Sequence, residues 1–600
     1  MDEPRNFSSD GDAVSNVDPR EVIDRVPTEL LVQVFLLATG ELREIGLVVP
    51  AKWYSHTKME TRSLISLTHV CRKWRQVVLQ APLLWTRMNC YTPSQLRAFW
   101  ERSRGLPISL AIHHNDIEHY VGTSSTPEAT RDKIEEILAV THQLVRSLDL
   151  RLEGEDGMDH SPPSWLSSCD MPNLEVLVLS IRRDRKTRVS RKNALIGNNV
   201  RSLKALAITE LGGWFPVDMF PSLTHLLLDC TNASIKELLR LLRDCPKIEV
   251  LHLPGSYFEF DGVVADPVSL PTLKLLAFTG ADSKTLDLLR FVHIHHTVPI
   301  RMMSTFISVD DSEETFSPED IFPIPFDIIP SIRGATHLDI RMNEGLFEVH
   351  FALHGAASGL WMFGSPYPTY GYQWLVDQIR RLSTDAPLSD VTSVVLDIPG
   401  SSPAVLVDLL RHLPSLETLT LRLYCPGKGG WQIGSGGRIP FEGSPADVLG
   451  ALCDALAGQA GAHASEPPTC PALRALAVCA NIGTDVCEDV QAELDRWRAR
   501  LEEMLDARAA TAAPIRSLRV QPTNRAYCGY GRDQGFDLEA TRAAFEEGLS
   551  ARVEKYSWVP PGETFFEEFK LWPLWRVGGE EEYWRLDSKY QPTYRAPERS

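Results

Sequence analysis

Histidine is the residue type here whose spacing most suggests chemistry, because His293, His295 and His296 lie within four positions. Imidazole nitrogens are common zinc ligands, and alternate residues of a strand share one side. No neighbouring cysteine or carboxylate completes a ligand set around them. We therefore expect surface or packing histidines and no metal site.

Two charged runs could bind charged ligands. The basic run 181–192 (IRRDRKTRVSRK) includes Arg182 and Arg183. A solvated loop is the default interpretation, but such a loop could also grip an acidic or phosphorylated tail of a partner. The acidic run 310–314 lacks the spacing of a calcium loop, so we expect a solvated loop there as well.

Catalytic motifs do not emerge from the sequence. GKGG at 427–430 lacks the glycine spacing and the following Ser or Thr of a phosphate loop. We find no nucleophile elbow, dinucleotide fingerprint or metalloprotease motif. We therefore expect a non-catalytic chain without a cofactor, the alternative being an enzyme hidden in region 300–390 or in the C-terminal tail.

Composition restricts the class of partner and the compartment. The net charge of -18 repels phosphate backbones, which argues against a nucleic-acid partner. The polar start has no secretory signal, and no apolar run is long enough to cross a membrane. The 11 scattered cysteines form no CxxC pair and indicate reduced thiols. We expect no membrane association and a cytoplasmic or nuclear location, or both.

The elements that would present a binding surface follow from a repeated pattern. Apolar residues recur at positions i, i+3 and i+5, with i at 145, 174, 203, 223, 248, 273, 416, 473 and 515. Six copies have a proline two residues before the first position, which we expect to end a preceding helix. The interval from 223 to 248 to 273 is 25 residues twice. The period and the LxxLxL pattern resemble those of leucine-rich repeats.

This resemblance implies an α/β fold: an irregular solenoid over 141–525 with parallel strands on the concave face and helices on the convex face. Regularity fails between about 300 and 390 and between 425 and 470, although TVPIRM and ATHLDI could be degenerate copies. Solvent-facing strand positions and adjacent loops would then bind a target protein. The candidate target-binding residues are Lys204, His225, His252, Lys274, Arg182 and Arg183.

The N-terminal hundred residues predict a separate helical module. Residues 1–20 are too polar to fold, and 21–92 contain helical apolar stripes near 28–38 and 64–78, followed by a short third segment. The letters VPTELL at 26–31, VCRKW at 70–74 and LLW at 83–85 resemble the F-box family. Val26 replaces the usual Leu, and residues 40–63 form an inserted loop between the first two helices.

The F-box resemblance implies docking to a Skp-type adaptor and through it to a cullin. Carried over by position, the adaptor-binding residues would be Pro27, Leu30, Leu31, Val34, Val70, Cys71, Trp74, Leu83 and Trp85. For each of them, packing inside the module is the alternative role. The expected function is substrate recognition in an SCF-type ubiquitin ligase, and the alternative is a repeat scaffold that acts without ligase assembly.

Two further segments complete the predicted organisation. Residues 93–140 should form a connecting helix and a first strand. Residues 526–600 are rich in Tyr, Phe and Trp. They would either cap the last repeat or form a partner-binding segment, because exposed aromatic side chains at this density make an adhesive patch.

Overall fold

The structure is a computed structural model of the whole 600-residue chain. The residues that it describes are 25–39, 47–49, 61–89, 93–113, 127–153, 166, 169–182, 195, 200–209, 216–229, 231–254, 257–259, 266–279, 287–304, 326–343, 348–356, 358–364, 371–399, 403–424, 431–433, 437–439, 445–458, 469–481, 489–511, 513–523, 537–561, 563, 565–566, 577–579 and 582–586.

The N-terminal module consists of short helices packed on one another: α2 (Thr28–Ala38), α3 (Thr61–Leu67), α4 (Arg72–Gln80) and the 3₁₀ turn η1 (Pro82–Trp85). Helix α4 begins where the Cys71 Sγ accepts a hydrogen bond from the Trp74 backbone N–H at 3.4 Å. The Trp74 ring then packs edge-on against Phe35 of α2 at 4.8 Å. Local capping and this cross-helix aromatic contact together fix α4 against α2.

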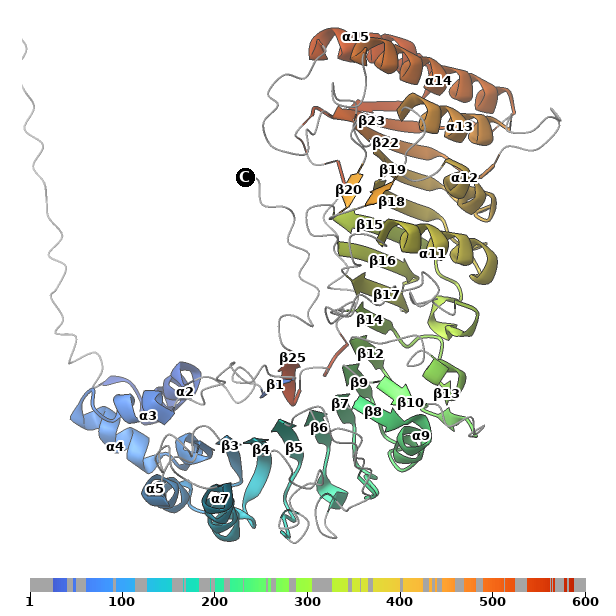
Figure 1. The fold of residues 1–600 in the computed structure, drawn as a ribbon. Coiled ribbons are helices and arrows are strands. Elements are labelled where there is room, and N and C mark those ends of the chain that lie inside the picture. Colours follow the sequence, from blue (N-terminus) through green and yellow to red (C-terminus); the bar gives the residue numbers. More distant parts are fainter. Residues whose placement is uncertain are drawn as a thin grey trace, which may run out of the picture.

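A large sheet, mostly parallel, forms the rest of the fold (Figure 1). From the N-terminal module onward its parallel strands are β2 (Arg87–Asn89), β3 (Ile108–His113), β4 (Val145–Glu153), β5 (Val176–Arg182), β6 (Ala205–Thr209), β7 (His225–Asp229), β9 (Val250–Pro254), β12 (Leu275–Thr279) and β14 (Ile300–Ser304). It continues through β18 (Ser393–Pro399), β19 (Thr418–Tyr424), β22 (Ala475–Asn481), β23 (Ser517–Thr523) and β24 (Lys555–Trp558).

Each of the nine predicted i, i+3, i+5 copies coincides with one of these strands. The second and third apolar residues of a copy, such as Leu226 and Leu228, alternate along the strand and are fully buried against the helices. Parallel register then stacks equivalent leucines from strand to strand, as in the pairing of Leu226 with Leu251. The sheet extends beyond 141–525 at both ends, because β2, β3 and β24 also join it.

The prolines of the pattern have a local role that the sequence interpretation missed. In every one of the six copies, the residue before the proline accepts a backbone hydrogen bond from the first apolar residue of the copy, as Phe220 does from Leu223 at 3.2 Å. Pro221 therefore occupies the second position of a four-residue turn, where its fixed φ is favourable. The residue before each proline is buried, so the turn also anchors the strand in the core.

Between β14 and β18 the sheet changes its connectivity. β15 (His337–Asn343) and β17 (Gly359–Gly364) flank β16 (Glu348–His354), which is antiparallel to both, and β17 pairs in parallel with β14. TVPIRM and ATHLDI thus contribute β14 and β15, whereas β16 and β17 were not predicted. The sequence of these strands shows only alternating apolar residues, of which Val349, Phe351 and Leu353 are buried. It lacks the LxxLxL spacing of the predicted copies.

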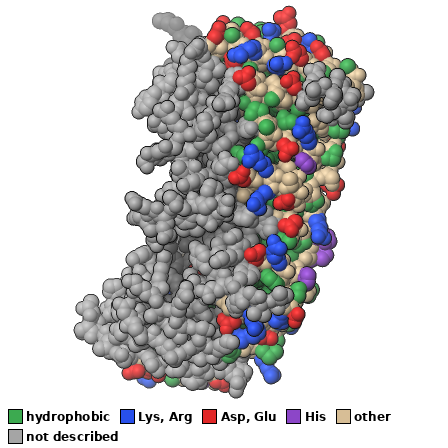
Figure 2. All heavy atoms as spheres, turned by 45° about the vertical axis from the view of Figure 1, so that its right-hand side comes forward, with side chains coloured by type: hydrophobic (Ala, Val, Ile, Leu, Met, Phe, Trp, Pro, Cys, Tyr) green, Lys and Arg blue, Asp and Glu red, His purple; other side chains and the backbone are tan. Residues whose placement is uncertain are grey.

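Helices line the outer side of the curved sheet (Figure 1). They are α5 (Pro93–Ser103), α7 (Pro127–Thr141), α9 (Ile235–Arg243), α11 (Gly371–Asp385), α12 (Pro403–Arg411), α13 (Pro445–Ala457), α14 (Val490–Ala510) and α15 (Leu538–Leu549). The 3₁₀ turns are η2 (Val200–Ser202), η3 (Leu288–Arg290), η5 (Phe326–Ile328), η6 (Pro330–Ile332) and η7 (Ser550–Arg552). Basic and acidic side chains are intermixed on this outer side (Figure 2).

Small strand pairs lie beside the main sheet. β8 (Thr231–Ser234) pairs with β10 (Tyr257–Glu259), β11 (Val268–Ser269) pairs with β13 (Val292–His293), and β20 (Trp431–Ile433) pairs with β21 (Gly437–Ile439). One further pair links the two ends of the chain. β1 (Leu47–Val49), inside the inserted loop 40–63, pairs in parallel with β25 (Trp584–Leu586) of the C-terminal segment. Figure 1 places this pair inside the curve, close to the N-terminal helices.

Candidate protein-interaction surfaces

An exposed apolar surface lies on the N-terminal module. Along α2, Leu30, Val34 and Leu37 are 56%, 49% and 60% exposed, although each belongs to the most apolar helix stripe of the module. Val70, before α4, and Leu83, in η1, are also more than half exposed. We call these five residues the module patch. Large apolar side chains gathered on one small module are typical of a surface that a partner covers.

The nine predicted adaptor-binding residues divide into two groups. Pro27, Leu30, Val34, Val70, Cys71 and Leu83 are exposed. Leu31 is buried and Trp74 is half-buried. Leu31 packs into the core of the module, so adjacent letters of the motif point in opposite directions.

Trp85, one of the two tryptophans among the predicted docking residues, lies inside the chain. Its side chain is 1% exposed, and its indole N–H donates to the Val78 carbonyl at 2.8 Å. The ring packs edge-on against Phe99 of α5, and the Arg102 guanidinium lies 4.2 Å from its centroid. Trp85 therefore packs η1 against α4 and α5. Its buried side chain is not accessible to a partner.

The exposed face and the helix order agree with the comparison to known families. Residues 23–91 match the F-box-like family. The match is confined to the N-terminal module, and the comparison with curated proteins finds no significant match for the chain. F-box domains in general bind Skp-type adaptors. The matched span includes the insertion 40–63, in which β1 is the described element.

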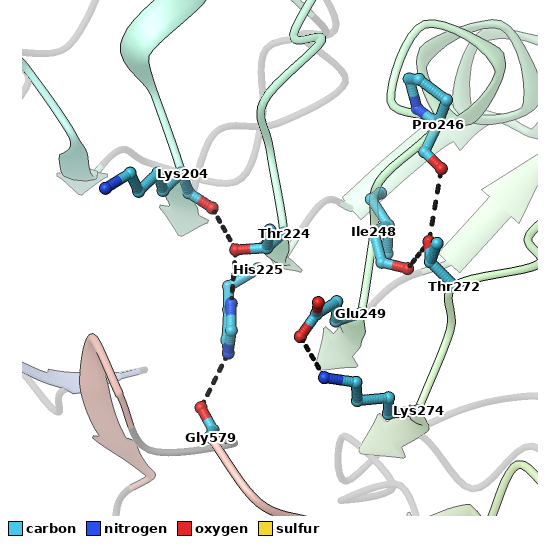
Figure 3. A network of polar contacts seen from close by, with 9 residues as sticks. All are labelled: Lys204, Thr224, His225, Pro246, Ile248, Glu249, Thr272, Lys274 and Gly579. Carbon is cyan, nitrogen blue, oxygen red and sulfur yellow. Dashed lines mark hydrogen bonds and ion pairs between the residues drawn. The ribbon is translucent and has the colours of Figure 1, made fainter.

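Charged side chains lie where the strands of the sheet begin. Lys204 precedes β6 and pairs with Glu175 at 3.3 Å, and Lys274 precedes β12 and pairs with Glu249 at 2.6 Å. Both lysine side chains are about half exposed, at 43% and 50%. The two predicted target-binding lysines are therefore accessible, but each is already paired with an acidic residue that directly precedes the adjacent strand, as Figure 3 shows for Lys274 and Glu249.

His225, the third predicted target-binding residue, is buried by the chain's own C-terminal segment. Its Nε2 lies 2.9 Å from the Gly579 carbonyl, and its Nδ1 lies 2.9 Å from the Thr224 hydroxyl (Figure 3). The Tyr583 ring packs edge-on against the imidazole at 4.8 Å. Burial lowers the pKa of His225. Solvent and partners cannot reach this side chain while Gly579 and Tyr583 cover it.

His252 is also buried, at 5% exposure, which the sequence pattern did not predict. Burial and the nearby Arg301 lower its pKa to about 3, so the imidazole is neutral near pH 7. Arg182 ends β5, but its side chain lies outside the described residues, as does the whole of Arg183. The exposed candidates among the described residues are therefore Lys204 and Lys274.

The sequence interpretation missed a row of polar residues across five strands. Parallel register aligns Arg341 with Asp397, Arg422, Cys479 and Gln521, one from each of β15, β18, β19, β22 and β23. We call this set the arginine row. Its residues follow the third apolar residue of a strand copy, as Arg422 follows Leu421. The available signal was therefore the position directly after that residue, whereas the predicted candidates lay between the apolar residues of a copy or in the basic run 181–192.

Ion pairs hold the guanidinium groups of the arginine row in place. Arg341 pairs with Asp339 at 2.7 Å on the same strand, and Arg422 pairs with Asp397 at 3.1 Å on the neighbouring one. Burial raises the pKa of Asp339, and the Arg341 contact opposes that shift. The Arg341–Asp339 pair is bidentate, through Nε and Nη2 of Arg341 and the two carboxylate oxygens, and such pairing fixes the plane of the guanidinium.

Two phenylalanines of the C-terminal segment lie on this row. Phe566, 8% exposed, has its ring 4.7 Å from the Arg422 guanidinium and 5.9 Å from that of Arg341. Phe565, 3% exposed, lies 4.9 Å from the guanidinium of Arg519, which is also on β23. Two aromatic residues of the tail, which the sequence could place only in a cap or in a partner-binding segment, therefore lie on the strands of the main sheet.

The part of the chain that the structure describes contains neither a cluster of metal-ligand side chains nor a helix that could span a membrane. Within that part, no three His, Cys, Asp or Glu side chains are arranged to hold a metal ion. His293, His295 and His296 are all exposed, and the His295 imidazole contacts the Thr297 hydroxyl at 2.7 Å. Among the described helices, none combines the length and apolarity needed to cross a bilayer.

Proposed function

We propose that this chain is a non-catalytic substrate receptor of an SCF-type ubiquitin ligase. The single observation that supports this role best is the module patch, which leaves Leu30 and Val34 exposed within an F-box-like module. A Skp-type adaptor would cover this patch and connect the chain to a cullin. Other subunits would perform ubiquitin transfer, in the cytoplasm or the nucleus.

We further propose that the sheet and its outer helices are an irregular leucine-rich-repeat solenoid that holds the target protein. Support comes from the coincidence of the nine copies with nine parallel strands and from the six proline turns, each anchored by a buried residue before the proline. In such an array, neighbouring units cover one another's apolar faces, which leaves the inner strand positions available for recognition.

Adaptor capture tests the docking role. The full chain and its Leu30→Asp variant would be mixed with a purified Skp-type adaptor and recovered by pulldown. A carboxylate buried in an apolar contact carries a large desolvation penalty, so we expect at least about a hundredfold weaker binding. Met219→Asp is the matched control, because Met219 is 65% exposed but lies outside the module. Equal binding by wild type and Leu30→Asp would refute the assigned surface.

Recovery of the cullin separates the ligase role from the scaffold role. A ligase subunit brings the cullin with the adaptor when the tagged chain is isolated from cells, and Leu30→Asp loses both. Recovery of the adaptor without the cullin would instead favour a repeat scaffold that acts without ligase assembly.

A further inference from the structure

The arginine row contacts a turn of the chain's own C-terminal segment, in which the Glu563 backbone N–H donates to the Pro560 carbonyl at 3.2 Å. The Gln521 side-chain amide donates two hydrogen bonds to main-chain carbonyls, to Pro560 at 2.8 Å and to Glu563 at 2.9 Å. The Cys479 thiol donates to the Gln521 Oε1 at 3.4 Å and so leaves the amide N–H groups for those carbonyls. Main-chain hydrogen bonds of this kind bind a peptide backbone independently of its side chains.

Aromatic side chains supply the sequence-dependent part of this contact. The segment crosses the strands, because its carbonyls contact Gln521 on β23 whereas the Phe566 ring lies over Arg422 on β19 and near Arg341 on β15. The ring of Phe565 lies beside Arg519, and both rings are buried together with Cys479 and Val559. A desolvated guanidinium over an aromatic ring is a favourable contact that aliphatic side chains cannot replace.

We propose that these subsites bind target protein through a turn followed by two consecutive aromatic residues, and that Pro560, Glu563, Phe565 and Phe566 occupy them in cis. The identification of the ligand as a ligase target rests on the proposed function. The binding chemistry does not, because it comes from the contacts above. An incoming segment must displace the chain's own, whose tethering gives it a high effective concentration.

The test uses the full chain and a fluorescent peptide of residues 559–570 (VPPGETFFEEFK). In the variant Phe565→Ala/Phe566→Ala the subsites are vacated, so we expect the peptide to bind at least about tenfold more tightly than to wild type. Adding Arg422→Ala and Arg519→Ala to that variant should abolish the gain. A peptide with Phe565 and Phe566 replaced by alanine is the ligand control and should not bind.

Tyr583→Ala is the matched protein control. It removes an aromatic contact of the same C-terminal segment at His225, but it leaves Phe565 and Phe566 on the arginine row. We expect its peptide affinity to equal that of wild type. If the double variant keeps its circular dichroism spectrum yet gains no peptide affinity, the two phenylalanines form a structural cap and the proposal is overturned.

A measurement on the wild-type chain avoids any dependence on variant folding. Excess unlabelled peptide should accelerate amide hydrogen exchange at residues 559–566, since displacement frees the chain's own segment. No acceleration at saturating peptide would overturn the proposal as well. Adaptor pulldown from the same preparation keeps the two proposals separate: peptide binding without adaptor binding refutes the ligase role and leaves the aromatic subsites intact.

Discussion

Neighbouring residues with the same chemistry have opposite roles in the N-terminal module. Leu30 is 56% exposed and Leu31 is 4% exposed, although both are motif leucines on α2. A helix turns by about 100° per residue, so consecutive side chains cannot share one face. The motif therefore contains both residues of the exposed module patch and residues of the core, and the exposed fraction of each side chain distinguishes them.

Alanine substitutions at these two leucines should separate the two roles. Leu31→Ala should lower the local opening free energy of α2 and α4 by about 2–5 kcal/mol, because it leaves a cavity beside Phe35 and Val78. Leu30→Ala should change it by less than about 0.5 kcal/mol. Native-state hydrogen exchange of the α2 and α4 amides measures both. Similar protection losses in the two variants would contradict the assignment of Leu31 to the core.

At the scale of the elements, one buried arginine joins α14 to its neighbours. Arg508 is fully buried and donates to the carbonyls of Leu456, Thr469, Cys470, Leu473 and Ala513. The carbonyls of Leu456, Thr469, Cys470 and Leu473 lie at the end of α13 and around the proline turn before β22, whereas that of Ala513 follows α14. Burial lowers the pKa of Arg508. Helix C-terminal and turn carbonyls that lack partners would be costly to bury, and this side chain satisfies them.

Replacing Arg508 should therefore destabilise two adjacent units at once. We expect Arg508→Ala to lower the unfolding free energy of α13, α14 and β22 by about 3 kcal/mol or more, since several buried carbonyls lose their donor. Arg500→Ala on the same helix is the control. Its side chain is 47% exposed and pairs with Asp454 and Glu503, so about 0–1 kcal/mol is expected. Hydrogen exchange in the three elements measures both variants, and equal losses would contradict the carbonyl account.

At the scale of the whole molecule, the C-terminal segment connects distant parts of the sheet. It contacts the arginine row through Phe565 and Phe566, β7 through Gly579 and Tyr583, and the inserted loop through β25. The last contact pairs residues more than 500 positions apart in the sequence, for which loop closure is entropically costly. Several separate contacts along one segment offset that cost.

An engineered cross-link tests this closure. The register pairs Val48 with Arg585, so Val48→Cys/Arg585→Cys should form a disulfide under mild oxidation. The exposed Cys71 would be changed to Ser in all variants, which keeps an acceptor at the start of α4. Val48→Cys/Glu554→Cys is the control pair, because Glu554 precedes β24 at the far end of the sheet (Figure 1). A faster mobility on non-reducing gels reports the bond; its absence in the first pair would contradict the β1–β25 pairing.

Buried histidines make the stability of the molecule depend on pH. Burial and Arg301 lower the pKa of His252 to about 3, and burial and Arg341 lower that of His350 to about 4. Both are neutral in the folded chain and become protonated near pH 6.5 once unfolded. Their contribution to stability is therefore present above pH 6.5 and declines as the pH falls toward 4.

Thermal unfolding should report this decline. For His252 alone, a change from pH 6.5 to pH 5 should cost about 2 kcal/mol, because the unfolded chain takes up a proton that the folded chain excludes. His252→Gln should give a flatter dependence of Tm on pH over this range. A variant with the same slope as wild type would show that His252 does not exclude the proton.

The sequence by itself determined the elements that depend on local periodicity. Alternating apolar residues placed nine strands, six of them preceded by a proline, and helical stripes placed the helices of the N-terminal module, because both patterns arise from geometry within a few residues. The single stripe near 64–78 is divided in the structure into α3 and α4. The strands β16 and β17 had only a short alternation, which is ambiguous without their neighbours.

Tertiary structure alone decided which predicted residues remain accessible. His225 and His252 are buried beside residues distant in the sequence, such as Gly579 and Arg301, and no local pattern encodes those partners. The arginine row exists because parallel register aligns residues from five separate strands. The contacts of Phe565 and Phe566 with these strands depend on the path of the C-terminal segment. Long-range packing and register, which composition and periodicity do not specify, therefore fixed the recognition surface.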